Sequence, residues 1–130
     1  MDFRFPREEH LKSRTIIRLL FKKGHSFKVY PLRLVWIPIP EASSSAPPQF
    51  ALSVPKRHFP KAVHRNRLRR RIREAYRLNR HLLKPFTTAT DQSYALMFIY
   101  IGREIVDYAT IESAMIRTLE RLSTYIAKAP

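Results

Sequence analysis

The chain has 130 residues, a size typical of one domain, and 45% of them are hydrophobic, which is enough for a folded core. Its net charge of +15 makes polyanions the expected partners, with nucleic acid preferred to an anionic membrane. The absence of cysteine excludes disulfides and thiolate metal sites, and no apolar run approaches the ~20 residues that span a bilayer.

The N-terminal segment predicts one helix. The first ten residues lack the apolar stretch of a secretory signal, so a cytoplasmic protein is expected. Residues 1–9 are expected to be a mobile N-terminus. From His10 to Lys23 apolar residues recur at helical spacing, and Gly24 is the expected C-cap.

Two strands should follow this helix. The run 27–39 is apolar and partly alternating, which predicts a strand, in one piece or split. Pro31 and Pro38 within it suggest a sheet edge or strand ends. The Ser- and Pro-rich segment 40–49 suits a long hairpin loop, and residues 50–55 predict a further strand.

The C-terminal half predicts a long basic helix, a buried strand and a final helix. The basic helix lies within residues 56–83, and the continuous apolar run 93–102 predicts a central strand. Residues 111–126 predict an amphipathic helix with Thr110 as its N-cap. The chain 1–130 is therefore expected to be a single α+β domain, a sandwich in which helices cover a small, mostly antiparallel sheet.

Positive charge is concentrated on the basic helix. Residues 56–81 hold eleven of the 25 Lys and Arg but one of the ten acids, Glu74. On a helical wheel four apolar residues form a stripe that should face the sheet: Leu68, Ile72, Ala75 and Tyr76. Arginines fill the remaining arc, and guanidinium groups match phosphate oxygens bidentately. A solvated face usually mixes Lys with Glu, so this face favours nucleic acid over a merely solvated surface.

RNA is the preferred nucleic acid. Helix-turn-helix proteins need a short pair of helices, whereas this helix stands between two strands, so no DNA partner is expected. A membrane-surface role is disfavoured because the helix lacks the bulky apolar face of helices that lie on lipid. An arginine face with few base-reading amides fits a folded RNA recognised by its shape and phosphates.

The segment FALSVPKRHFPKAVHRNRLRRRIREAYR, residues 50–77, resembles the signature of the bacterial ribonuclease P protein component. A Ser-Val-x-Lys run at a strand end is followed by Ala-Val-x-Arg-Asn-Arg-x-Arg-Arg-x-x-Arg-Glu. The segment LKSRTIIRLLFKKGHSF, residues 11–27, is similar to the family's first helix, so the resemblance extends from about Phe5 to Ile126.

The resemblance implies a fold like domain 2 of ribosomal protein S5, with a left-handed crossover around the arginine helix. The family's enzyme removes the 5′ leader of precursor tRNA. Its RNA subunit is the catalyst and uses Mg²⁺, so no metal is expected on the protein alone. The implied partners are the ribonuclease P RNA subunit and precursor tRNA.

The resemblance also implies two sets of binding residues. Six residues of the basic helix would bind the RNA subunit: Arg65, Asn66, Arg67, Arg69, Arg70 and Arg73. The leader would lie in a cleft between the first helix and the sheet, bound by Ile17, Phe21, Arg33, Val35, Ser53 and Lys56. Phe21 fits either a core position or an exposed position that stacks on a base. Asn66 fits either a helix cap or an RNA contact.

No catalytic residue is expected in the protein itself. Its acids form no close pair placed for two-metal chemistry, and its five His lack metal-ligand spacing.

The alternative function is a structural or ribosomal-type RNA-binding protein without a role in tRNA processing.

Overall fold

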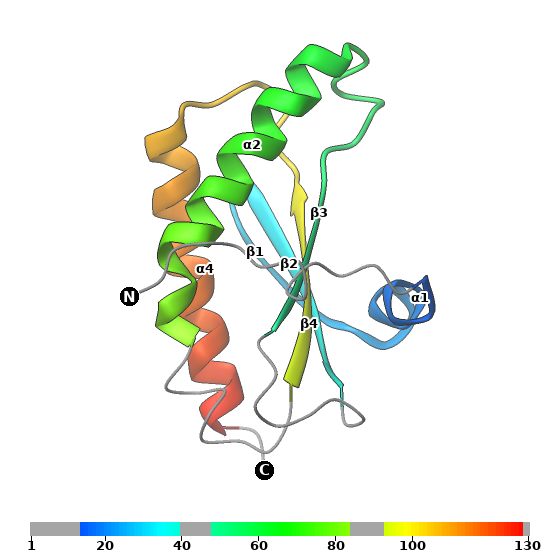
Figure 1. The fold of residues 1–130 in the computed structure, drawn as a ribbon, viewed down its shortest axis with the longest axis vertical. Coiled ribbons are helices and arrows are strands. Elements are labelled where there is room, and N and C mark those ends of the chain that lie inside the picture. Colours follow the sequence, from blue (N-terminus) through cyan, green and yellow to red (C-terminus); the bar gives the residue numbers. More distant parts are fainter. Residues whose placement is uncertain (1–13, 40–47, 84–92, 129–130) are drawn as a thin grey trace.

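The structure is a computed structural model that describes residues 14–39, 48–83 and 93–128. Helices α2 and α4 cover one face of a four-stranded sheet, and α1 lies on the other side (Figure 1). The elements in chain order are α1 (Arg14–Lys23), β1 (His25–Val29), β2 (Leu32–Ile39), β3 (Gln49–Ser53), α2 (Ala62–Asn79), the 3-10 helix η2 (Arg80–Leu83), β4 (Ser93–Tyr100) and α4 (Tyr108–Lys128).

The strand order of the sheet is β1-β2-β4-β3. β1, β2 and β4 pair antiparallel, whereas β3 pairs parallel to β4, so the chain crosses over through α2 between these two strands. The mostly antiparallel sheet and the central place of the strand in 93–102 are therefore confirmed. The predicted hairpin loop is wrong, because β4 lies between β2 and β3. Residues 1–9 and 40–47, for which mobility and a loop were expected, lie outside the described residues.

The apolar run 27–39 is split into two strands, which confirms one of the two alternatives. β1 and β2 form a hairpin joined at Tyr30 and Pro31, with a cis peptide bond between them. Pro31 lies in the turn and Pro38 is the last residue but one of β2, so both stand at strand ends. The alternative, an edge position, holds for β1 but not for β2, which pairs on both sides.

The main core lies between the sheet and the helices α2 and α4. The stripe predicted on α2 is confirmed, since each of its four apolar residues is at most 1% exposed. The ring of Tyr76 stacks on Phe50, with 4.4 Å between centroids, and both contact Phe98 of β4. Burial raises the pKa of Tyr76, so its hydroxyl stays neutral in the core. One face of α2 is thus buried in the core, and only the opposite face is accessible to a binding partner.

A smaller core fixes α1 to the other side of the sheet. Leu20 packs there with Val35 and Met97. Gly24 ends α1, and its N–H donates to the Leu20 carbonyl at 3.0 Å. A Cβ on Gly24 would lie 2.3 Å from that oxygen and 2.7 Å from Val35 Cγ1, so the close approach requires glycine although its φ is not positive. The part of the predicted helix before Arg14 lies outside the described residues.

The final helix begins earlier than predicted. α4 starts at Tyr108, and Asp107 Oδ1 accepts the N–H of Thr110 at 2.9 Å. The N-cap is therefore Asp107, and the prediction of Thr110 is wrong. Hydrogen bonds from Thr110 lower the pKa of Asp107, since they favour the charged carboxylate.

Candidate nucleic-acid interface

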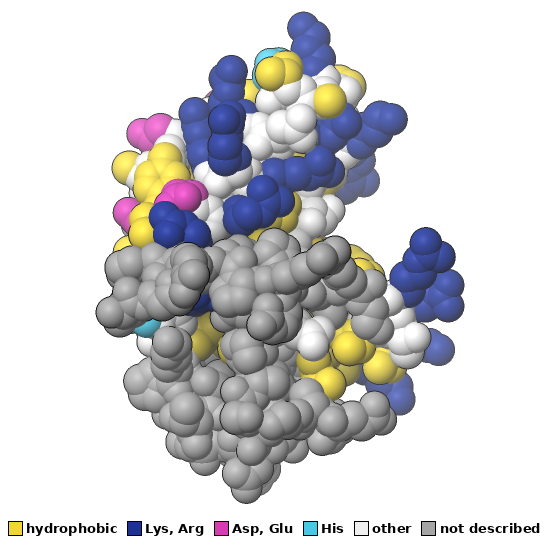
Figure 2. Space-filling model, viewed as in Figure 1, with side chains coloured by type: hydrophobic (Ala, Val, Ile, Leu, Met, Phe, Trp, Pro, Cys, Tyr) yellow, Lys and Arg dark blue, Asp and Glu magenta, His cyan; other side chains and the backbone are white. Residues whose placement is uncertain are grey.

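Exposed arginines line the outer face of α2. Figure 2 shows Lys and Arg side chains gathered over α2 and, separately, over α1, while the Asp and Glu visible on this face lie at its left margin. Arg67, Arg70 and Arg73 are exposed. Within the described residues none of these three forms an ion pair, because Glu74 pairs with Arg77. Three guanidinium groups therefore stand open to an anionic partner.

Arg65 has a second role at the start of α2. Its Nη1 donates to the carbonyl oxygens of Phe59 at 2.9 Å and of Pro60 at 2.8 Å. The residue in the N-cap position, Lys61, provides no side-chain cap. Arg65 therefore holds the preceding connection against the helix. The sequence motif did not predict this structural role.

Asn66 and Arg69 lie on the same helix as neighbours. α2 begins at Ala62, so Asn66 is inside the helix and the cap alternative is excluded. Asn66 is exposed, and its Oδ1 accepts a hydrogen bond from Arg69 Nη1 at 3.5 Å. Its contact with RNA stays a prediction.

Two further residues, Arg71 of α2 and Tyr108 of α4, lie where the connection between β4 and α4 meets this surface. Arg71 Nη1 donates to the Val106 carbonyl at 2.5 Å. The Val106 N–H donates in turn to the Tyr100 hydroxyl at 3.4 Å, which fixes the connection against the core. Tyr108 opens α4 directly after it, and its hydroxyl donates to Glu112 at 3.1 Å. Burial and the bond to Glu112 raise the pKa of Tyr108 to about 12. Sequence reasoning missed Arg71 and Tyr108, because no local pattern predicts contacts between residues this far apart in the chain.

The sheet face beside α1 carries three polar residues and Ile99 in one register row. Lys28 of β1 pairs with Arg33 of β2, which pairs with Ile99 of β4, which pairs with Ser53 of β3. Val35 packs in the core under α1, and residues two apart on a strand share a face, so Arg33 points to the side of α1. Arg33 Nη2 donates to the Ser26 hydroxyl at 3.2 Å, while its buried Nε has no partner among the described residues.

The residues predicted for a leader cleft fall into two groups. Phe21 is 62% exposed and Lys56 is exposed, so the core alternative for Phe21 is excluded. Ile17 is half-buried and Val35 is buried beneath α1, where both belong to the smaller core. α1 therefore presents Phe21 outside the core, on the helix that packs on the same sheet face as Arg33. The cleft itself stays a prediction.

Neither a metal-binding cluster nor a membrane-spanning helix occurs in the described ranges. Residues 14–39, 48–83 and 93–128 contain no group of three His, Asp or Glu side chains placed to hold a metal ion. The same ranges contain no helix that is both long and apolar enough to cross a membrane.

Comparison with known proteins points to one family. The family model for Ribonuclease P matches residues 5–123. The chain is 36% identical over 121 residues to the ribonuclease P protein component of Porphyromonas gingivalis, covering 93% of this chain and 88% of the relative. It is 35% identical over 105 residues to that of Chlorobaculum tepidum, covering 75% and 68%.

Two solved structures share the fold. The RNase P protein of Thermotoga maritima superposes with a TM-score of 0.68 at 22% identity, covering 87% of this chain and 96% of that one. The RNase P protein of Staphylococcus aureus superposes with a TM-score of 0.66 at 19% identity, covering 92% and 95%.

Proposed function

Because the chain belongs to the ribonuclease P protein family and is the protein component of that enzyme, we propose that its two basic surfaces bind two different RNAs. The arginine face of α2 binds the RNA subunit. The sheet face beside α1 binds the 5′ leader of precursor tRNA. The observation that carries the first assignment is the row of exposed, unpaired arginines at Arg67, Arg70 and Arg73.

The arginine face suits a folded RNA on physical grounds. Each guanidinium fork presents several N–H donors to phosphate oxygens, and the helix holds the forks on one rigid face. Phosphate contacts supply affinity and orientation without reading bases. The apolar stripe on the opposite side of α2 fixes this orientation through the main core.

The sheet face suits a single strand. Phe21 offers an exposed ring on which an unpaired base can stack, and Arg33 with Lys28 offers positive charge at the neighbouring strands. An extended leader needs this combination of aromatic and cationic side chains. A mature tRNA, which has no leader, would leave this surface empty.

The cleavage chemistry belongs to the RNA subunit. The RNA subunit would hold Mg²⁺, which would supply an activated water and stabilise the leaving oxygen. The role of the protein is to bind and orient the two RNAs. The bacterial relatives support a cytoplasmic location.

Reconstitution tests this proposal. A bacterial ribonuclease P RNA is mixed with the purified protein and a precursor tRNA at a Mg²⁺ concentration at which the RNA alone is slow. We expect the protein to accelerate 5′ cleavage and to cleave nothing when the RNA subunit is omitted. A protein that binds unrelated structured RNA equally well and leaves cleavage unchanged would favour the alternative, a structural RNA-binding protein.

A further inference from the structure

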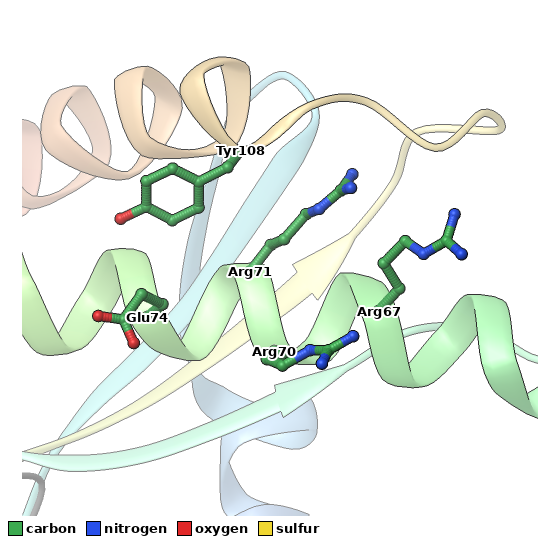
Figure 3. A pocket seen from close by; sticks show the side chains of 5 residues that line it. All are labelled: Arg67, Arg70, Arg71, Glu74 and Tyr108. Carbon is green, nitrogen blue, oxygen red and sulfur yellow. The ribbon is translucent and has the colours of Figure 1, made fainter.

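A hollow lies between α2 and the first turn of α4. Its volume is about 400 Å³, and it is lined by Arg67, Arg70, Arg71, Glu74 and Tyr108 (Figure 3). In Figure 3 the ring of Tyr108 forms one side, and the arginines extend from α2 toward the other. The hollow adjoins the arginine face but includes a wall from a different helix.

Two of its walls are held in place by the protein. Arg71 is tied to the Val106 carbonyl, and the Tyr108 hydroxyl is tied to Glu112. Glu112 also accepts a hydrogen bond from Asn79 at 3.1 Å, which links it to α2. The ring of Tyr108 is therefore oriented before any partner arrives, so little side-chain entropy is lost on binding.

The remaining lining arginines have no partner among the described residues. Among the described residues Arg67 and Arg70 form no hydrogen bond or ion pair. Glu74 is paired with Arg77, so its charge is largely compensated. The hollow is consequently positive, and its lining includes two guanidinium groups that have no partner among the described residues.

The volume of the hollow and the chemistry of its lining together favour one kind of ligand. A volume of about 400 Å³ is within the roughly 300–1,000 Å³ of small-molecule sites and exceeds what one phosphate group would fill. An aromatic wall beside free arginines matches a base joined to a phosphate. We propose that the hollow holds one unpaired nucleotide of the RNA subunit, with its phosphate between Arg67 and Arg70 and its base against the ring of Tyr108.

This inference rests on the proposed function and adds a specific contact to it. The α2 arginines alone would recognise only the spacing of phosphates. A base seated on Tyr108 would require a nucleotide that is not paired in the RNA at that position. Tyr108 therefore sets the register of the RNA on the protein.

Binding of the RNA subunit tests the inference with three variants of one residue type. Tyr108→Leu should weaken binding about 5- to 100-fold, the range for losing one stacked base, without changing the salt dependence. Tyr108→Phe keeps the ring and should bind within about twofold of wild type. The matched control is Tyr125→Leu, a partly exposed tyrosine about 25 Å away on α4, which should bind as wild type.

Arg67→Ala separates the inference from the proposed function. It should weaken binding and flatten the log–log salt slope by about 0.7–0.9, the effect of one lost phosphate contact. If Arg67→Ala has this effect while Tyr108→Leu binds as wild type, the nucleotide site is overturned and the arginine face stands. If neither variant affects binding, both are overturned.

A crosslinking experiment covers the case in which Tyr108→Leu is poorly folded. Tyr108 is replaced by the photoreactive p-benzoylphenylalanine, and the crosslinked nucleotide of the RNA subunit is mapped. One dominant crosslink to an unpaired nucleotide supports the inference. Crosslinks within paired helices, or none in a complex that forms normally, overturn it.

Discussion

Replacing Phe21 by Ala should separate leader binding from stability. Since Phe21 is 62% exposed, folding removes only about 80 Å² of its area from water, taking roughly 200 Å² for the whole side chain. At about 25 cal/mol/Å² this is at most about 2 kcal/mol, and the better helix propensity of Ala offsets part of it. A fully buried Phe would cost about 3–5 kcal/mol.

The functional effect should be confined to substrates that carry a leader. Stacking on a base contributes about 1–3 kcal/mol, so the holoenzyme with Phe21→Ala should bind precursor tRNA about 5- to 100-fold more weakly. Binding of mature tRNA should change little, because it has no leader. Affinities for both tRNAs and a melting curve measure these quantities in parallel.

The matched control is Leu19→Ala on the same helix. Leu19 is 38% exposed and lies on a different side of α1 from Phe21, so its loss should leave both affinities unchanged. Equal weakening for precursor and mature tRNA in Phe21→Ala would refute the assignment of the leader to this face.

Three further predictions concern the contacts that position the two surfaces. Gly24→Ala should lower the free energy of unfolding by about 1–3 kcal/mol, because its Cβ would overlap the Leu20 carbonyl, and urea unfolding measures this. Arg65→Ala should lower it by about 1–2 kcal/mol through the loss of two carbonyl contacts, again in urea. Asp107→Asn should make thermal stability less sensitive to acid. Because the pKa of Asp107 is lowered in the fold, its carboxylate stabilises the fold at pH values above the usual pKa of 3.8, and this contribution is lost as the pH falls through the folded-state pKa.

Each of these predictions has its own control. Gly102→Ala should be milder than Gly24→Ala, since its Cβ would meet a side-chain ring at 3.0 Å and not a backbone oxygen. Arg73→Ala should leave stability unchanged, because Arg73 is exposed, so equal losses for Arg65 and Arg73 would contradict the role of Arg65. Asn also caps helices, so Asp107→Asn should match wild type at neutral pH, and an unchanged acid response would contradict the assigned cap.

Periodicity predicted which faces are buried. The stripe on α2 follows from helical spacing, because its residues all lie in the main core. The continuous apolar run of β4 follows from its central place, because alternate residues of the strand lie in the main core and in the smaller core. The arginine face could be predicted for the same reason, as the complement of the stripe. The motif resemblance added the division into two RNA-binding surfaces.

Periodicity could not predict which elements become neighbours. The insertion of β4 between β2 and β3 depends on the whole sheet, and the local loop composition gave no sign of it. The contact of Arg71 with Val106 and the hollow at Tyr108 depend on how α2 and α4 meet. Asp107 was within reach of sequence reasoning, since an acid three residues before Thr110 is itself a good N-cap.

Equilibrium binding of the isolated RNA subunit is the most direct test of the central claim that the α2 face binds it. The double variant Arg70→Glu/Arg73→Glu is compared with Arg14→Glu/Arg18→Glu, an equal charge change on exposed residues of α1 across the sheet (Figure 1). The α2 variant should lose more than about tenfold in affinity and flatten the salt slope by about 1.4–1.8, at 0.7–0.9 per contact. The α1 variant should bind nearly as wild type. Equal losses for the two variants would contradict the claim, because they would indicate a general attraction to positive charge and not a binding face.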